Sequence, residues 1–406
     1  MASDSTAIKE AVITIKVFGI GGGGNSVLKR IAESGITGVE LVAVNTDAKQ
    51  LSTLSALKVK TVQIGEALTK GRGTGGNPAI GMHAVEREEE KLRSMMRGAD
   101  LIFVTAAMGG GTGTGATPEV ARIARDLGIL TVGVVTMPFG FEGRRKMRIA
   151  QEAVVQMRAY MDALIVVRND NLMKLSDDRK MSFVGAFHAA DEVLKQAIDC
   201  VAEMILTTGV VNVDFADVAT IFRQGANCDA ILGMGQSKIS AVAAVQQAVE
   251  SPLIERSLEG ARGMILNITG DDSLTLYDVS EATKYIYKQT GDDVNIIFGT
   301  VIDNKMDGVI QATIIATDFP DRSGTNPHTG AMPQMRPSMS TVQQMPQSQP
   351  QPQTQQGPVG NPASNGDFTL EAPSFMNKRN NEEVSGGAFA IPAFKLTRDD
   401  SAPEGK

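Results

Sequence analysis

The chain has 406 residues, of which 42% are hydrophobic and 21% charged, so it has room for two domains and a further segment. Its formal net charge of −7 and the lack of a basic run argue against a nucleic-acid-binding protein. Two cysteines, Cys200 and Cys228, make no disulfide framework, and three scattered histidines do not fit a zinc site. The N-terminus lacks a secretory pattern and no apolar run could span a bilayer, so we expect a cytoplasmic protein without direct membrane insertion.

The first half of the chain alternates strand and helix patterns. Residues 12–20, 39–45, 101–107, 129–137 and 163–167 form continuous apolar runs of strand length. Helical patterns lie between them, and for one of these we expect Thr117 as the N-cap and Pro118 in the first turn. Continuous apolar strands separated by helices predict a parallel sheet that is covered on both faces.

The second half begins with apolar residues spaced three or four apart over 182–206, which predicts one long helix. Further helix and strand patterns follow as far as Asp318. The fold class that we expect is α/β, with a Rossmann-like parallel-sheet domain joined by a long central helix to a smaller α/β domain and a disordered C-terminal tail. The predicted segments are a flexible N-terminus (1–11), the first domain (12–181), the central helix (182–206), the second domain (207–318), a disordered linker (319–385) and a docking peptide with its tail (386–406).

Glycines follow the first predicted strand in the stretch "GIGGGGNS". Gly19, Gly21 and Gly24 satisfy the dinucleotide-binding spacing G-x-G-x-x-G, and Asp47 lies at the distance of a ribose-binding acid. The stretch is equally typical of a site for another phosphate ligand or of a structural turn. An NAD-dependent oxidoreductase is therefore an alternative interpretation of this motif.

A second and richer glycine loop, "MGGGTGTGATP", follows the strand at 101–107. Five glycines in seven residues are more than a structural turn needs, and they favour backbone N–H groups brought close to an anion. A third glycine-rich stretch, 69–78, is typical of either a phosphate-facing loop or a surface loop. The chain has no G-x-x-x-x-G-K-[ST] motif, which excludes an ordinary P-loop NTPase.

The segments "GIGGGGN", "AVNTD", "KGRGTGGNP", "GGGTGTG", "PFGFEGRRK", "RNDNL", "AFHAAD" and "NVDFADV" occur in this order along the chain. In sequence and order they resemble the FtsZ family of the tubulin/FtsZ superfamily. The resemblance covers residues 12–318 almost continuously and extends to "IPAF" near the C-terminus. It implies a GTPase of bacterial cell division that polymerises head to tail.

The resemblance also implies a binding site for GTP or GDP. Glu142 then contacts the ribose, Phe187 packs on the guanine, and Asp191 accepts hydrogen bonds from its N1–H and exocyclic amine. Lys146 stands near the phosphates, where many relatives have Arg. Mg²⁺ is expected with the nucleotide, but no residues are predicted as dedicated metal ligands. The residues implied along the nucleotide backbone and phosphates are Gly21, Gly22, Gly23, Gly24, Asn25, Gly109, Gly110, Gly111, Thr112, Gly113, Thr114 and Gly115.

The stretch "NVDFADV" contains two acids, Asp214 and Asp217, that share a face if the segment is helical. Taken alone it is a common helix start, with Asp214 as the N-cap. The resemblance implies instead that Asn212, Asp214 and Asp217 are catalytic and complete the active site of the next subunit. Hydrolysis would then require assembly, because one subunit holds the nucleotide and its neighbour supplies the acids.

The resemblance further implies a place in the cell, a cytoplasmic ring at mid-cell beneath the inner membrane. The partners would be other copies of the chain, together with membrane-tethering and regulatory division proteins that bind Ile391, Pro392, Ala393 and Phe394. Arg168, where Pro is common, and the extension after Phe394, which is longer and more acidic than is typical, depart from the usual family pattern. A filament or regulatory protein of the same fold that does not hydrolyse GTP is a further alternative.

Overall fold

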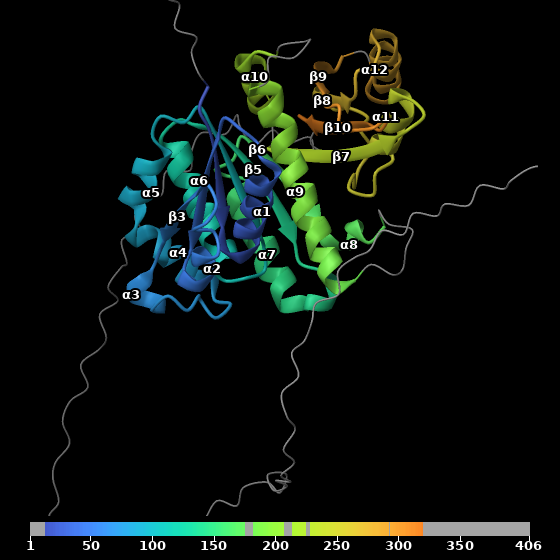
Figure 1. Cartoon of the computed structure of the whole chain (residues 1–406). Coiled ribbons are helices and arrows are strands. Elements are labelled where there is room, and N and C mark those ends of the chain that lie inside the picture. Colours follow the sequence, from blue (N-terminus) through green and yellow to red (C-terminus); the bar gives the residue numbers. More distant parts are fainter. Residues whose placement is uncertain (1–12, 175–181, 207–212, 225–227, 292, 320–406) are drawn as a thin grey trace, which may run out of the picture. The chain divides into compact units, whose positions relative to one another are not determined.

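The computed structural model describes residues 13–174, 182–206, 213–224, 228–291 and 293–319, all of which belong to one unit. The expected docking peptide, nearly all of the expected linker and Asn212 lie outside these residues. Figure 1 shows a central sheet with helices packed around it. The strands are β1 (Ile15–Ile20), β2 (Val39–Asn45), β3 (Val59–Gln63), β4 (Leu101–Ala107), β5 (Leu130–Met137), β6 (Ala163–Arg168), β7 (Asp229–Ser237), β8 (Gly263–Gly270), β9 (Asn295–Ile302) and β10 (Ile310–Thr317).

The sheet has ten strands in the order β3-β2-β1-β4-β5-β6-β7-β10-β8-β9. From β3 to β7 every neighbouring pair is parallel, and only β10 runs antiparallel to its neighbours β7 and β8. The first six strands have the doubly wound order 3-2-1-4-5-6. Strands β2 and β3 are added on one side of β1, and β4, β5 and β6 on the other, so the strand order reverses between β1 and β4. The predicted class, a mixed α/β fold with a mostly parallel sheet, is confirmed.

Helices connect the strands and cover both faces of the sheet. They are α1 (Gly21–Ser34), α2 (Ala48–Ser52), α3 (Glu66–Thr69), α4 (Pro78–Arg87), α5 (Glu89–Met96), α6 (Thr112–Asp126), α7 (Arg144–Met157), α8 (Asn169–Leu172), α9 (Phe183–Leu206), α10 (Phe215–Arg223), α11 (Ala241–Val249) and α12 (Leu276–Thr290), with a 3₁₀ turn η1 (Gly140–Glu142). None of the helices in the described part of the chain combines the length and the apolar character that a membrane span requires.

Alternation along β1 shows how the two faces are filled. Ile15 and Val17 point into one core, which contains residues of α1, α9 and α10, whereas Phe18 and Ile20 point into a second core with residues of α4, α5, α6 and α7. All four side chains are fully buried. A third core lies between the C-terminal strands and helices α11 and α12. Burial on both faces explains why the parallel strands are continuously apolar in sequence.

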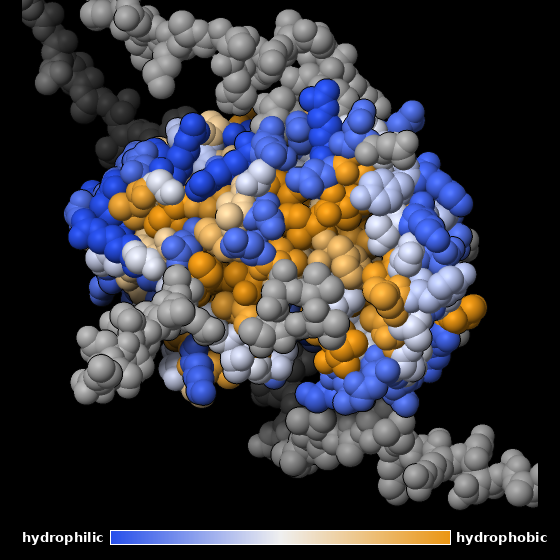
Figure 2. Space-filling model, turned by 90° about the horizontal axis from the view of Figure 1, so that it is seen from above, coloured by the Kyte–Doolittle hydropathy of each residue, from blue (hydrophilic) through white to orange (hydrophobic). Residues whose placement is uncertain are grey.

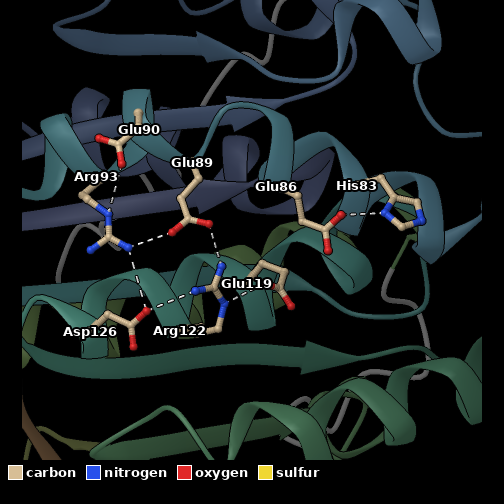
Figure 3. Close-up of polar contacts among 8 residues, drawn as sticks. All are labelled: His83, Glu86, Glu89, Glu90, Arg93, Glu119, Arg122 and Asp126. Atoms are coloured by element: carbon tan, nitrogen blue, oxygen red, sulfur yellow. Dashed lines mark hydrogen bonds and ion pairs between the residues drawn. The ribbon is translucent and has the colours of Figure 1, made fainter.

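An ion-pair network links α5 to α6 on the surface of the second core (Figure 3). Arg122 of α6 bonds to Glu89 of α5 at 2.9 Å, to Glu119 at 2.9 Å and to Asp126 at 3.1 Å. Arg93 of α5 bonds to Glu89 at 2.7 Å. The bonds from the two arginines lower the pKa of the Glu89 carboxyl. Arg122 therefore fixes the outer surface of α6, whose first turn faces the candidate site.

One expectation about α6 is wrong. The helix begins at Thr112 rather than beyond Thr117, so the glycine loop itself forms the first turn. Thr117 is therefore inside the helix, where its hydroxyl donates to the Gly113 carbonyl, and Pro118 is likewise interior. Thr117 and Pro118 are typical of a helix start in sequence. The helix begins earlier because the glycines of the loop can adopt the backbone conformation of its first turn.

A substitution in α6 tests the packing that fixes this first turn. A Cβ on Gly115 would collide with the backbone carbonyl of Pro78 in α4. We expect Gly115→Ala to lower the free energy of unfolding by about 1–3 kcal/mol, because overpacking outweighs the helix propensity gained. Urea denaturation measures this.

Gly110→Ala is the matched control, since a Cβ there meets no atom within 4 Å. Equal stability of the two variants would contradict the close contact between α4 and α6.

Candidate functional site

A cavity of about 540 Å³ opens where β1, β4 and β5 end, at the point where the strand order reverses. Crevices at such switch points are the usual ligand sites of open α/β sheets. All three glycine-rich stretches contribute to its lining. The sequence-predicted residues that line it are Gly22, Gly23, Gly110, Gly111, Thr112, Gly113, Glu142, Lys146, Phe187 and Asp191.

Two long helices begin at this cavity, α1 at Gly21 and α6 at Thr112. Neither has a side chain that caps its N-terminus, whereas α10, α11 and α12 are capped by Asp214, Ser240 and Thr275. The first four N–H groups of an α-helix have no partner within the helix, and the helix dipole makes this end positive. The two uncapped ends therefore present a set of donors suited to an anion.

Glycine is required where these helix ends meet. Gly21 has φ +68°, and a Cβ on it would lie 2.8 Å from the backbone nitrogen of Gly113. A Cβ on Gly111 would collide with the hydroxyl of Thr74 in the third glycine-rich stretch. The three stretches are thus held together by backbone contacts that a side chain would block, and the third stretch is not a free surface loop.

Several predicted residues support the cavity without lining it. The Asn25 side chain is buried, and in its better amide orientation it donates to the carbonyls of Gly19 and Gly21 at 2.9 and 3.1 Å. Thr114 accepts a hydrogen bond from the Gly109 N–H at 2.8 Å. The other residues of this kind are Gly21, Gly24 and Gly115, which pack against Gly113, Thr105 and Pro78. These residues hold the two glycine turns in place through contacts on the side away from the cavity.

Near η1 lies the only positively charged side chain that the described residues contribute to the cavity lining. Lys146 donates to Glu142 at 2.9 Å, and the other oxygen of Glu142 accepts from the Phe139 N–H at 3.0 Å. The Lys146 side chain is half exposed and so can move toward an anion. The structure thus brings the two sequence-predicted residues together at one edge.

Helix α9 supplies the opposite wall with Phe187 and Asp191, one turn apart. Phe187 packs edge-to-face on Phe139 and on Phe183, with ring centroids 5.2 Å apart in each pair. Asp191 lies 3.4 Å from Arg30 of α1. Burial raises the pKa of its carboxyl, and the guanidinium of Arg30 opposes this shift.

Sequence reasoning missed part of the lining. Asn169, at the start of α8, is 4% exposed and lines the cavity, yet its Oδ1 has no partner. Asn45 at the end of β2 and Gln50 of α2 also line it, joined by a hydrogen bond of 2.8 Å. Asn169 lies in the "RNDNL" segment that was recognised, so the signal was present without an assigned role. Asp47, the possible ribose acid, lines the cavity but caps α2 through the N–H groups of Lys49 and Gln50.

The acidic side chains of the cavity lining are the residues that could bind a metal ion directly. Asp47 caps α2, Glu142 pairs with Lys146 and Asp191 pairs with Arg30, so each is already engaged. Among the described residues no group of three His, Cys, Asp or Glu side chains could hold a metal ion. Mg²⁺ commonly binds through substrate phosphates and water with few protein ligands.

The acidic pair lies at the far end of α9 from the cavity. Asp214 is the N-cap of α10 and accepts from the Ala216 N–H at 3.1 Å, and Asp217 lies in the first turn of that helix. Phe187 and Asp191 are near the start of α9, which continues to Leu206 before α10. Figure 1 shows α10 at the top and α8, beside the start of α9, at the bottom. The structure therefore does not bring Asp214 and Asp217 into this chain's own cavity.

Comparison with known proteins agrees with this architecture. The GTPase-domain model of the Tubulin/FtsZ family matches residues 14–177, and the model of the FtsZ family C-terminal domain matches residues 228–320. An FtsZ dimer from M. jannaschii is 37% identical, with a TM-score of 0.71, over 75% of this chain and 88% of that chain.

More distant proteins share the fold. CetZ2 from Haloferax volcanii, solved as a GTPgS-bound protofilament, is 23% identical with a TM-score of 0.62, over 75% of this chain and 92% of that chain. CetZ1 from the same organism, a GDP-bound monomer, is 18% identical with a TM-score of 0.65, over 76% and 95% of the two chains. Together with the two domain matches, the identity of 37% over most of the length of an FtsZ shows that the chain belongs to the FtsZ family.

Proposed function

We propose that the chain binds and hydrolyses GTP and assembles head to tail into filaments, each nucleotide site being completed by the acidic loop of the next subunit. One observation carries the proposal. A phosphate-type cavity and an acidic helix start lie at opposite ends of the same long helix, α9. The assignment to a family of GTPases agrees with this division of the site.

The phosphate end of the cavity is suited to a nucleotide by its backbone donors. Hydrogen bonds to a charged acceptor are worth about 1.5–3 kcal/mol each, and micromolar binding needs about 8 kcal/mol. A few of the uncapped N–H groups of α1 and α6 therefore suffice, with Lys146 as the cation of the lining. Such a site could bind a nucleotide anion in a chain of net charge −7 without a cluster of lysines.

The α9 end of the cavity is suited to guanine. An ionised Asp191 can accept two hydrogen bonds, and guanine offers two donors, N1–H and the exocyclic amine, on one edge. Phe187 provides an aromatic surface for the base. The Asn169 side chain, whose Oδ1 has no partner, supplies a further polar group at the same wall.

The catalytic step needs a group that orients water on the γ-phosphate, since phosphoryl transfer depends mainly on positioning and electrostatics. Asp214 and Asp217 are suited to that task, but α9 has 24 residues, about 36 Å at 1.5 Å per residue, and separates them from their own cavity. A second copy stacked head to tail brings them to a neighbour's cavity. Such a contact does not close on itself and generates a filament. Mg²⁺ bound through the phosphates would neutralise developing charge.

The face that carries α10 fits an intersubunit contact. Figure 2 shows this end of the molecule, with hydrophobic residues gathered in its middle and hydrophilic residues around them. Val213 and Phe215 flank Asp214 and are only partly buried, as is Leu206 at the end of α9. An apolar centre with a polar rim is typical of protein interfaces.

A role in the bacterial division ring, beneath the inner membrane, is part of the same proposal. It rests on the assignment to the FtsZ family. Binding of tethering and regulatory division proteins would use residues 391–394, which lie outside the described part of the chain. Asp47, the acid that the NAD-dependent alternative would need for the ribose, is engaged as the cap of α2. Release of phosphate from GTP distinguishes an enzyme from a filament that does not hydrolyse it.

Gly110→Ala tests the phosphate end. A Cβ at this lining position projects into open space, so the variant should keep the stability of the wild type. We expect GTP and GDP to bind at least about tenfold more weakly, because the methyl group occupies space that phosphate needs and 1.4 kcal/mol corresponds to tenfold. Isothermal titration measures the affinity. Unchanged binding of GDP would place the phosphates elsewhere.

Asp191→Ala tests whether Asp191 recognises the guanine base. Inosine triphosphate lacks the exocyclic amine of GTP, so the wild-type chain should bind it at least about tenfold more weakly, a loss of one charge-assisted hydrogen bond. The variant should bind both nucleotides weakly and with equal affinity. A preference for GTP that survives in the variant would show that another residue reads the amine.

A mixture of two inactive variants tests completion of the site by a neighbour. Asp217→Ala keeps an intact cavity, and Gly110→Ala keeps intact acids. At a GTP concentration that fills the intact cavity but lies well below the Kd of Gly110→Ala, each variant alone should hydrolyse little GTP. In an equal mixture about a quarter of the contacts in a random filament pair an intact cavity with intact acids, and about a quarter of the wild-type rate should return.

Light scattering of the mixture is the control, because it shows whether the two variants still assemble into filaments. No recovery of phosphate release above the sum of the separate variants, despite normal scattering, would refute the proposal.

A further inference from the structure

A second cavity, of about 280 Å³, lies between α9 and the C-terminal strands and shares no lining residue with the first. One face of α9 lines it with polar residues at helical spacing, whereas other faces of the same helix pack into the first core. The residues across the cavity come from β8, β9, β10 and the turn after β9. The lining consists of Glu192, Lys195, Gln196, Asp199, Cys200, Glu203, Asn267, Thr269, Val301, Asp303, Met306, Gln311 and Thr313.

The charges in this cavity are unbalanced, with four carboxyl groups and one ammonium group. Lys195 donates to Asp199 at 3.0 Å and to Glu192 at 3.3 Å, so its charge is shared by two acids. Glu203, one turn beyond Asp199, has no hydrogen bond or ion pair with any described residue. Two acids on one face of a helix repel each other when both are ionised.

Two hydrogen-bond acceptors in the lining have no donor among the residues that the structure describes. They are Oδ1 of Asp199 and Oδ1 of Asn267, and the Asn267 side chain is 3% exposed. A buried acceptor without a donor is costly. A carboxyl group that takes up a proton becomes a donor as well as an acceptor. A single proton on Glu203 would therefore remove one negative charge and supply one missing donor.

We propose that Glu203 is a proton-operated latch between α9 and the C-terminal strands. When protonated, its hydroxyl donates to one of the two acceptors and holds the helix against the sheet. When ionised, it is repelled by Asp199 and Asp303, and the cavity opens to solvent. The latch connects the segment before α10 with the C-terminal part of the sheet and acts independently of the nucleotide cavity.

The electrostatics of the surroundings put this switch near neutral pH. Burial raises the pKa of Glu203 from 4.5 to about 7, with Asp199 and Asp303 adding to the rise and Lys195 opposing it. The other charged or titratable lining groups are Glu192 and Cys200 on α9, whereas β8 and β10 contribute only neutral side chains. A raised pKa means that the stabilising contribution of Glu203 is complete below pH 4.5 and is lost as the pH rises through about 7.

Cys200 offers a direct measure of the opening, because it is a buried free thiol in the cavity lining. The experiment compares full-length Cys228→Ser with Cys228→Ser/Glu203→Gln, in which glutamine mimics the protonated acid. An uncharged aromatic disulfide reagent is used from pH 5.5 to 8. We expect equal modification rates at pH 5.5 and at least about fivefold faster modification of the parent at pH 8, because local opening controls access to a buried thiol.

The sign of the change in modification rate distinguishes opening of the cavity from a direct effect of the Glu203 charge on the Cys200 thiol. An ionised Glu203 raises the pKa of the Cys200 thiol, which would slow modification of the parent rather than speed it. Glu250→Gln, which changes an exposed acid outside the cavity lining, is the matched control and should behave like the parent. A parent-to-variant ratio that stays constant or falls with pH would overturn the proposal.

A second variant keeps the test decisive if Glu203→Gln does not fold. In Cys228→Ser/Asp199→Asn the negative charge beside Glu203 is gone, so the transition in Cys200 reactivity should move to lower pH. An unmoved midpoint in a folded variant would contradict the latch.

Discussion

The backbone contact between the first turns of α1 and α6 is the constraint on which the site depends. A Cβ on Gly21 would lie 2.8 Å from the Gly113 nitrogen, and a Cβ on Gly113 would lie 2.8 Å from the Ala107 carbonyl oxygen at the end of β4. The contact follows from the sheet, because β1 and β4 are parallel neighbours and both helices begin at their carboxyl ends. With no side-chain cap at either helix, the exposed N–H groups face one cavity. The same glycines thus allow the close packing and carry the N–H groups of the proposed anion site.

Helix α9 is the second organising element. Its start supplies Phe187 and Asp191 to the cavity, its middle faces the polar cavity with Glu203, and its end leads toward the acidic start of α10. The rigid length that keeps Asp214 and Asp217 away from their own cavity is also what makes a second subunit necessary in the proposed mechanism. In the proposed mechanism the same helix contacts one nucleotide and positions the groups that act on another.

The sequence predicted the strands at 39–45 and 101–107 to the residue and the long helix to within one residue, because these segments are strongly apolar or strongly periodic. It did not predict β7, where glycines and polar residues in "DAILGMGQS" weaken the strand pattern. It also misplaced the start of α6, since glycine loops carry no propensity signal for the helix that they begin. Asn169 was missed because a buried amide is recognisable only once its surroundings are known. The proposed domain boundaries and the roles of the site residues stay predictions.

The dependence of GTPase rate per molecule on protein concentration tests the central claim most directly. If the acids of one subunit complete the cavity of the next, the rate per molecule stays near zero below a threshold concentration. It then rises steeply as light scattering reports filaments. A rate per molecule that is independent of dilution would mean that the active site is complete within one chain, and it would contradict the account.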